Sequence, residues 1–434
     1  MDVQSPAATA GTRKTSRRTA ALEVPDAQVF EPTMEEFSDF PKFIKSIEAK
    51  NAHLAGIVKI KPPKEWQPRK IGYKPEDFPF VLKKPIEQKF KPVGKRAGCY
   101  QTSCLGKTKK TIPEYKEMAT SKKYEAPPHT FTNYFDYDKL ERLYWNSLRR
   151  GKTEESQWPI YGADVSESIT DPEVKEFNIG KLDSILNILE EETGDVYKGV
   201  NSPYLYFGMW KATFSWHVED MDFYAINFIH YGAPKTWYCV PPKYGHLLEK
   251  ACSELFPDLF STCSNFMRHK SCLVEPKILD EMGVPYQKVV QEERDIIVVF
   301  PYAYHSGFNH GWNIAESTNF AFKRWIDFGK YHRPCDCSAR GVRINMDPFV
   351  KRFQPDRYEE WIAGRDIQPH PEEPPESERR QEILERMKDP LAYAARLQLE
   401  RENRLDGPQY NFIDDYEASD GNRYLLRLFS SHII

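Results

Sequence analysis

The segment from Tyr204 to Phe322 consists of short runs of aromatic and β-branched residues, separated by turns that contain Gly, Pro or charged residues. The runs are YLYFGM, TFSWHVE, FYAINFIHY, KTWYCV, IIVVF and NIAESTNFAF. Their length and composition are typical of β-strands. Because no helical pattern alternates with them, they favour a barrel or a jelly roll.

The N-terminal part changes character at Phe30. Residues 1–28 are rich in Ala, Thr, Ser and Arg without periodicity, so we expect a disordered tail. Its basic run, residues 13–18, indicates either nuclear import or a solvated tail without that role. Thr33 and Glu36 then have the spacing of a helix capping box. The apolar positions that follow share one helical face: Phe37, Phe40, Phe43, Ile44 and Ile47.

A basic stretch lies within residues 73–125, which are rich in Pro, Gly and Lys. Between Lys83 and Lys110, nine basic residues stand against one acid, Glu87. We interpret this stretch as a basic, poorly ordered insertion. Its charge either serves solubility or attracts a polyanion, such as DNA in a non-specific contact.

Helical patterns flank the strand-rich segment. Residues 137–149, within a connecting region at 126–170, and residues 179–193 each place apolar side chains on one face. We expect C-terminal helices at 338–366, and then an acidic, Pro-rich linker and a charged tail at 367–434. A chain of 434 residues fits one large catalytic unit with such appendages.

Hydropathy and cysteine usage bear on membrane association and on the redox state of the cysteines. No apolar run approaches the roughly 18 residues that a membrane span needs, so we expect no membrane contact. No secretory signal is visible, and we therefore expect the eight cysteines to be reduced. Any cysteine cluster is then better explained by metal binding than by disulfides.

His217 and Glu219 lie two positions apart in a strand-like run. Residues two apart on a strand point to the same face, so both can meet one metal ion. His305 follows the later run IIVVFPYAYH as a third ligand. Two histidines and one carboxylate leave three coordination positions open, which suits non-haem iron(II). Taken alone, the pair is more often a core histidine beside a solvated glutamate, and the iron site is favoured only together with its partner residues.

The same pair has a second chemical interpretation. A His-x-Glu pair with a later Pro-Cys also occurs in zinc deaminases, where the pattern continues as P-C-x-x-C. Here the run is Pro334-Cys335-Asp336-Cys337, which is one residue too short. We therefore favour the iron site.

An acidic co-substrate would need a cation in a largely apolar pocket. Lys235 begins the run KTWYCV, and a buried lysine must be paired. Asn227 lies on the preceding strand, Trp237 has the same strand parity as Lys235, and Tyr161 can donate a phenolic hydrogen bond. Singly, each residue is better explained by a structural role, as a core aromatic, a turn-adjacent amide or a solvated lysine at a strand end.

Three cysteines and a histidine are candidates for a second metal site. Cys263, His269, Cys335 and Cys337 provide the Cys₃His set of a closed, structural zinc site. His310 and His332 are competing ligands that the spacing does not exclude. The other interpretation is a set of unrelated thiols and imidazoles.

Longer blocks carry a family resemblance. FEPTMEEFSDFPKFIKSIE resembles a JmjN domain, and NSPYLYFGMWKATFSWHVEDMD, APKTWYCVPP and FPYAYHSGFNHGWNIAESTNFA resemble a JmjC domain. From about Phe30 to Pro355 the chain resembles the jumonji histone lysine demethylases that act on trimethylated lysines of histone H3, except near residues 83–110. The resemblance implies a JmjN domain at 29–72 and a JmjC catalytic domain with its zinc site at 171–337. The implied fold is mixed α+β, with a double-stranded β-helix core of the jelly-roll or cupin type and flanking helices.

The resemblance also implies roles for single residues. The iron ligands would be His217, Glu219 and His305, and the zinc ligands Cys263, His269, Cys335 and Cys337. The residues implied to contact 2-oxoglutarate or line its pocket are Tyr161, Asn227, Lys235, Lys270, Phe214 and Trp237. Those implied to form a methyl-lysine pocket are Gly199, Tyr204, Tyr206, Ser317, Thr318 and Asn319. One departure is Ala225, which replaces a small hydroxyl residue beside the iron in relatives, and we expect little effect from it.

The implied activity is that of a dioxygenase that uses Fe(II), 2-oxoglutarate and O₂. Hydroxylation of a methyl group on a tri- or dimethylated lysine would release formaldehyde, succinate and CO₂. Ser317 and Thr318 resemble the pocket version that accepts both the ninth and the thirty-sixth lysine of histone H3. The implied partners are the methylated histone H3 tail and the nucleosome, in the nucleus. Two rival functions are an inactive jumonji scaffold that binds chromatin and a jumonji hydroxylase that acts on another protein or on RNA.

Overall fold

The computed structural model describes residues 24–372, apart from residues 95, 127–136, 152, 154–156, 336, 338–340 and 367. The basic run at residues 13–18 and the charged tail after residue 372 lie outside the described residues. So does most of the tail expected to be disordered. Its last residues are described, and there the backbone oxygen of Pro25 accepts a hydrogen bond from the side chain of Gln287.

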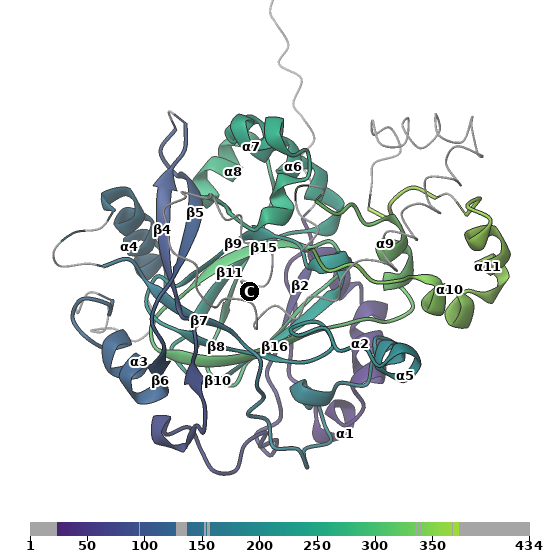
Figure 1. Ribbon diagram of the computed structural model, residues 1–434, viewed down its shortest axis with the longest axis horizontal. Coiled ribbons are helices and arrows are strands. Elements are labelled where there is room, and N and C mark those ends of the chain that lie inside the picture. The colour runs from purple at the N-terminus through teal and green to yellow at the C-terminus, as the bar shows by residue number, and fades with distance from the viewer. Residues whose placement is uncertain are drawn as a thin grey trace, which may run out of the picture.

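The strand-rich segment forms the curved sheets at the centre of the molecule (Figure 1). Its strands are β8 (Tyr204–Gly208), β9 (Thr213–His217), β10 (Tyr224–Gly232), β11 (Lys235–Val240), β12 (Cys272–Val274), β13 (Gln287–Gln291), β14 (Ile296–Val299), β15 (Tyr304–Asn309) and β16 (Asn313–Phe320). In one wall β10 pairs with β14 and β16, and in the other β15 pairs with β9 and β11. The runs expected to be strands are thus strands, and the expected jelly-roll core is confirmed.

The sheet curls until its two ends meet. Its order is β1-β2-β14-β10-β16-β8-β7-β4-β5-β12-β9-β15-β11-β13. The remaining strands are β1 (Val29–Phe30), β2 (Ile57–Ile60), β4 (Ile86–Pro92), β5 (Cys99–Gly106) and β7 (Ile160–Val165). Lys59 on β2 donates a hydrogen bond of 3.0 Å to the backbone oxygen of Val290 on β13, which links strands at opposite ends of the order. The result is a closed wall around the interior of the barrel.

The N-terminal unit is part of this wall. Thr33 and Glu36 form the expected capping box at the start of α1 (Met34–Phe37), and α2 (Phe40–Ala49) follows. The ring of Phe37 stacks on that of Phe177, with centroids 3.9 Å apart. Because β2 also pairs with β14, the unit is fixed both by packing and by a strand ladder.

The basic stretch is ordered, so the expectation of a poorly ordered insertion was wrong. Strands β4 and β5 form a hairpin that joins the main sheet through β7 and β12. The side chain of Gln88 is fully buried and bonds both the N–H and the C=O of Thr213, at 2.8 and 2.6 Å. Phe90 is buried, whereas Lys89 and Lys91 are exposed. This alternation is a strand period that the lysine-rich composition obscures.

The second expected amphipathic helix is shorter than its pattern predicted. A 3₁₀ turn at Ile179–Lys181 and α5 (Asn187–Thr193) replace one helix over residues 179–193. Between them, the hydroxyl of Ser184 accepts hydrogen bonds from the backbone N–H groups of Leu186 and Ala321. Ser184 therefore satisfies local backbone donors in a non-helical conformation, which interrupts the helix.

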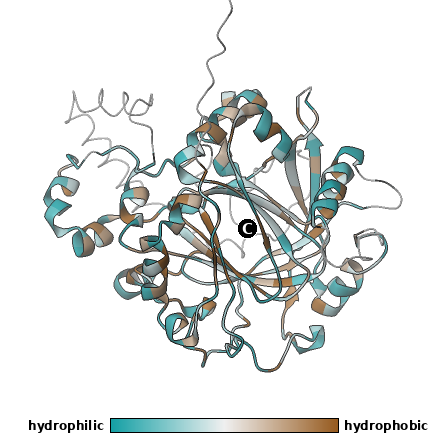
Figure 2. Ribbon diagram, turned by 180° about the vertical axis from the view of Figure 1, so that it is seen from behind, coloured by the Kyte–Doolittle hydropathy of each residue, from teal (hydrophilic) through white to brown (hydrophobic). Residues whose placement is uncertain are grey.

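The other helices surround the barrel. They are α3 (Ile112–Ala119), α4 (Tyr137–Arg150), α6 (Gly245–Leu255), α7 (Pro257–Thr262), α8 (Pro276–Met282), α9 (Trp325–Tyr331), α10 (Asp347–Phe353) and α11 (Pro355–Ile362). Helices α4, α10 and α11 fall where the sequence predicts helices. Hydrophobic and hydrophilic residues alternate along these helices (Figure 2). None of the helices in the described part combines the length and the apolar character needed to cross a membrane.

Candidate active site and metal centres

The three expected iron ligands converge inside the barrel. His217 on β9 is the register partner of His305 on β15. A ligand atom of each of these histidines and of Glu219 lies within 4.8 Å of the others. All three side chains are buried, at 0, 0 and 3% exposure. Strand pairing therefore builds the triad from positions 88 residues apart.

Two local details differ from the expectation. Strand β9 ends at His217, so Glu219 follows the strand; its φ of −62° and ψ of 154° keep the backbone extended and preserve the alternation. The run before His305 is not one strand. Strand β14 ends at Val299, and a turn that contains Tyr302 at φ 59° leads into β15.

Backbone carbonyls orient both histidine rings. The Nδ1 atom of His217 lies 2.7 Å from the oxygen of Ser215, and that of His305 lies 2.9 Å from the oxygen of Ala303. A carbonyl oxygen can only accept, so each Nδ1 carries a proton, and each ring turns its Nε2 toward Glu219. Metal-binding histidines are usually held in this way.

The carboxylate of Glu219 is held in its charged form. Burial alone would raise its pKa, but the neighbouring His305, Lys270 and Asn319 outweigh burial and hold the pKa below the usual range. Asn319 donates a hydrogen bond of 2.9 Å to Oε2, which leaves Oε1 toward the histidines. Lys270 lies 3.4 Å from Asp220. One carboxylate and two imidazoles in a buried site fit a divalent metal ion.

Lys235 is a buried cation enclosed by aromatic rings. Its Nζ lies 5.9, 5.6 and 5.6 Å from the ring centroids of Tyr206, Phe214 and Trp237. Burial lowers its pKa to about 7. Within the part of the chain that the structure describes, this Nζ has no hydrogen-bond partner. An uncompensated buried amine is costly, so the site fits an anionic ligand.

Two further expected pocket residues, Asn227 and Tyr161, are also buried. Both ends of the Asn227 side-chain amide are buried without a hydrogen-bond partner among the described residues. Tyr161 is fully buried on β7 and is hydrogen-bonded to Asn309. The indole of Trp237 donates to Gln291 at 2.9 Å, which fixes the plane of that wall.

The residues expected around a methylated lysine lie on neighbouring strands. Tyr204 and Tyr206 are on β8, and Ser317, Thr318 and Asn319 are on the adjacent β16, while Gly199 precedes β8 with φ 79°. Ser317 donates to the oxygen of Ile226 at 2.7 Å, and Thr318 to that of Val200 at 3.1 Å. Their positions are therefore set by backbone contacts.

Sequence reasoning missed Asp164 and Ser166 in this region. Asp164 has a φ of 58°, and burial raises its pKa well above the usual range while Lys270 and Tyr206 oppose that effect. Ser166 lies close to Tyr204 and lowers the pKa of that phenol, which burial raises. The available signal was an acidic residue inside the apolar run IYGADV, which is unusual for a strand.

The four candidate zinc ligands come together at the end of the barrel. One ligand atom from each of Cys263, His269, Cys335 and Cys337 lies within 4.8 Å of the others. The Sγ atoms of Cys263 and Cys335 are 3.6 Å apart, and Nε2 of His269 is 3.0 Å from Sγ of Cys335. Three thiols and one imidazole fit a closed zinc site.

The two competing histidines lie elsewhere. Nε2 of His310 is 2.6 Å from the hydroxyl of Thr236. Nδ1 of His332 faces Asp222 at 3.6 Å. Neither belongs to the cysteine cluster found among the described residues.

Comparisons with known families agree with this architecture. The family model described as "JmjC domain, hydroxylase" matches residues 204–320, and the one described as "jmjN domain" matches residues 28–62. The first match contains the whole triad and Lys235. The second contains the capping box and the apolar face of α2.

Three similar curated proteins are all named as lysine-specific demethylases. Over 338 residues, which are 78% of this chain, it is 47% identical to lysine-specific demethylase 4B of the mouse, 46% to lysine-specific demethylase 4D of the rat and 45% to probable lysine-specific demethylase 4F of humans. The matched region covers 30, 63 and 50% of those proteins, so the chain spans from about a third to two thirds of their length. The chain thus combines a match to the JmjN domain with a match to the JmjC hydroxylase domain, and the curated proteins to which it is similar are lysine-specific demethylases 4.

Proposed function

We propose that the chain is an Fe(II)- and 2-oxoglutarate-dependent demethylase of methylated lysines in histone H3. The observation that carries the proposal is the buried triad of His217, Glu219 and His305 beside the unpaired amine of Lys235. A metal ion would satisfy the triad, and an anionic co-substrate would satisfy the amine of Lys235. The names of the similar proteins point to the same activity.

Iron would be held by the Nε2 atoms of His217 and His305 and by Oε1 of Glu219. When bound, it supplies the activation of O₂ by which 2-oxoglutarate is converted to succinate and CO₂ and a methyl group is hydroxylated. The hydroxymethyl product loses formaldehyde and leaves a lysine with one methyl group fewer. Two neutral imidazoles and one carboxylate leave open positions for the co-substrate and oxygen.

The chain's own residues bind and orient the co-substrate. Lys235 pairs with the distal carboxylate of 2-oxoglutarate, and Tyr161 and Asn227 supply hydrogen bonds near it. Phe214 and Trp237 exclude water, which strengthens the charge-assisted bond. Such a bond contributes about 1.5–3 kcal/mol.

The proposed methyl-lysine pocket is lined by residues of the paired strands β8 and β16. Tyr204, Tyr206 and Ser317 present oxygen atoms that can meet polarised methyl groups through weak C–H···O contacts. Asp164 adds a carboxyl group close to Tyr206. We infer that tri- and dimethylated lysines at the ninth and thirty-sixth positions of histone H3 are substrates, and that the protein works in the nucleus.

The β4–β5 hairpin supports a second contact, with nucleosomal DNA. Lys89 and Lys91 are exposed on one face of β4. Strand β4 pairs with β7, which carries Tyr161, and so the basic face lies on a strand next to the site. Lysines on one exposed face can neutralise successive phosphates without reading a sequence.

The substitution His217→Ala should abolish formaldehyde release from a trimethylated histone H3 peptide, because one of three metal ligands is lost. Binding of Mn(II), a redox-silent substitute, should fall with it, while the circular dichroism spectrum stays unchanged. His246→Ala, which alters a half-buried histidine on α6, is the matched control. Full turnover by His217→Ala would refute the metal assignment.

Binding of 2-oxoglutarate should weaken as the pH rises above about 7. The pKa of Lys235 is lowered to about 7 by burial, so its ammonium form is present below that pH and lost above it. The Kd, measured by calorimetry with Mn(II), should rise by up to about tenfold per pH unit above 7. Lys235→Met should bind weakly at every pH.

A second buried lysine provides the control for this pH dependence. Burial lowers the pKa of Lys211 to about 8, and its Nζ donates to the oxygen of Gln157 at 3.0 Å. Lys211→Met should keep the wild-type profile. A flat profile in the wild-type protein would show that Lys235 does not pair with the co-substrate.

Cys263→Ser should remove one equivalent of zinc, as measured by elemental analysis, and lower the unfolding temperature. The reason is that the site links η7 (Phe266–His269) to the segment that follows α9. Cys104→Ser, which changes a thiol outside the cluster, should do neither. Equal zinc content in the two variants would rule out the proposed ligand set.

Replacing both Lys89 and Lys91 with Glu should weaken binding of duplex DNA and reduce the slope of log K against log salt by about two. Fluorescence anisotropy over a salt series measures both effects. The charge-matched control replaces Lys250 and Lys277, which are exposed on α6 and α8. If both pairs of substitutions act alike, the hairpin is not the contact.

A further inference from the structure

The start of the expected acidic linker is buried in the catalytic domain. His370 has 2% exposure, and its ring packs 4.4 Å from that of Tyr302 and 5.3 Å from that of Phe328. Its Nε2 lies 3.8 Å from Oδ2 of Asp222, which is itself buried. A solvated linker would not place a polar side chain there, so this position needs a structural or functional reason.

Asp222 is connected to the expected iron ligand Glu219 through the side chain of Arg268. Its Oδ1 accepts a hydrogen bond of 2.8 Å from Nη2 of Arg268, whose Nη1 donates to the backbone oxygen of Glu219 at 3.1 Å. Strand β9 ends at His217, so no strand ladder fixes the backbone at Glu219. Contacts from outside the sheet must therefore hold that backbone.

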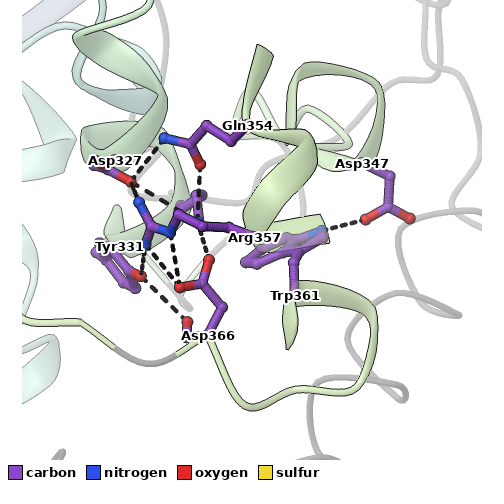
Figure 3. A network of polar contacts seen from close by, with 8 residues as sticks. Asp327, Tyr331, Asp347, Gln354, Arg357, Trp361 and Asp366 are labelled. Atoms are coloured by element: carbon purple, nitrogen blue, oxygen red, sulfur yellow. Dashed lines mark hydrogen bonds and ion pairs between the residues drawn. The ribbon is translucent and has the colours of Figure 1, made fainter. Parts of the chain in front are cut away.

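A polar network fixes the segment that carries His370 (Figure 3). Arg357 on α11 donates to Asp327 on α9 and to Asp366, both at 2.7 Å. Lys330, also on α9, bonds to Asp366, and the hydroxyl of Tyr331 donates to the backbone oxygen of the same residue at 3.2 Å. The side chain of Lys330 is fully buried. The network thus anchors the chain four residues before His370.

We propose that residues 341–366 and 368–372 form a C-terminal clamp that positions the iron ligand Glu219 through His370, Asp222 and Arg268. The inference rests on the proposed metal-binding function of the triad. His370 touches neither metal nor substrate and is a positioning residue. The helices that follow the barrel would then help to hold Glu219 in place.

The clamp has a specific effect on metal binding. Loss of an outer partner of a metal ligand typically weakens binding by about 10–100-fold. His370 acts through two further side chains, and His332 also faces Asp222 at 3.6 Å. We therefore expect the loss of His370 to raise the Kd for Mn(II) by about 10-fold, the low end of this range.

The test compares variants of the full chain with zinc bound and the iron site empty. His370→Phe keeps an aromatic ring between Tyr302 and Phe328 but removes the nitrogen that faces Asp222. His370→Gln restores an N–H donor in a side chain of similar reach. Arg365→Ala, in the same segment, removes only an exposed ion pair with Glu360 and is the control. The Kd for Mn(II) is measured from the electron paramagnetic resonance signal of free Mn(II).

The clamp predicts about 10-fold weaker Mn(II) binding by His370→Phe, near wild-type binding by His370→Gln, and no change in Arg365→Ala. Arg357→Ala, which removes the anchor at Asp327 and Asp366, should weaken binding as His370→Phe does. Wild-type affinity in His370→Phe, with the variant folded by circular dichroism, would overturn the clamp. If the wild-type chain itself bound no Mn(II), the proposed function would fail first, which separates the two failures.

Discussion

The antiparallel pairing of β9 with β15 is the constraint on which the rest of the site depends. It sets His217 opposite His305, although 88 positions separate them in the chain. A slip of one residue would turn one histidine to the other face of its strand and remove it from the triad. The N-terminal unit, the β4–β5 hairpin and β12 all support this pairing, because each adds a strand or a buried contact to the same closed wall.

The barrel interior concentrates polar groups that burial makes costly. Glu219 and Lys235 are both buried, one as an anion beside two imidazoles and the other as an amine among aromatic rings. Uncompensated charge inside a protein costs several kcal/mol, so the folded chain bears this cost at its active site. A metal ion and a dicarboxylate would relieve it together. Because each ligand removes the cost of burying one of these charged groups, that cost strengthens the binding of both ligands.

Much of the fold follows from local pattern, because strand period and capping chemistry act over a few residues. The six strand-like runs and the Thr33–Glu36 box are of this kind. The lysine-rich hairpin was missed because β4 has only two buried positions, Gln88 and Phe90, among charged residues. The break at Ser184 depends on the distant Ala321, and a single-helix pattern cannot reveal it.

The site was predictable to the extent that its residues belong to long motifs. Spacing alone could not decide whether the triad and the cysteine cluster bind metals. Whether distant residues converge is a property of the tertiary fold. Arg268 and His370 carry no motif that reasoning on a single sequence can use, and Asp164 stands out only as an acidic residue inside an apolar run. Their roles emerge from burial and from contacts across elements.

The most direct test of the account is turnover of a trimethylated histone H3 peptide with Fe(II), 2-oxoglutarate and O₂ each omitted in turn. Mass spectrometry follows the peptide, and separate assays follow formaldehyde and succinate. The account predicts loss of 14 mass units per methyl group (one CH₂, by composition), with one formaldehyde and one succinate, only when all three are present. A stable hydroxylated product without formaldehyde, or demethylation without 2-oxoglutarate, would contradict it.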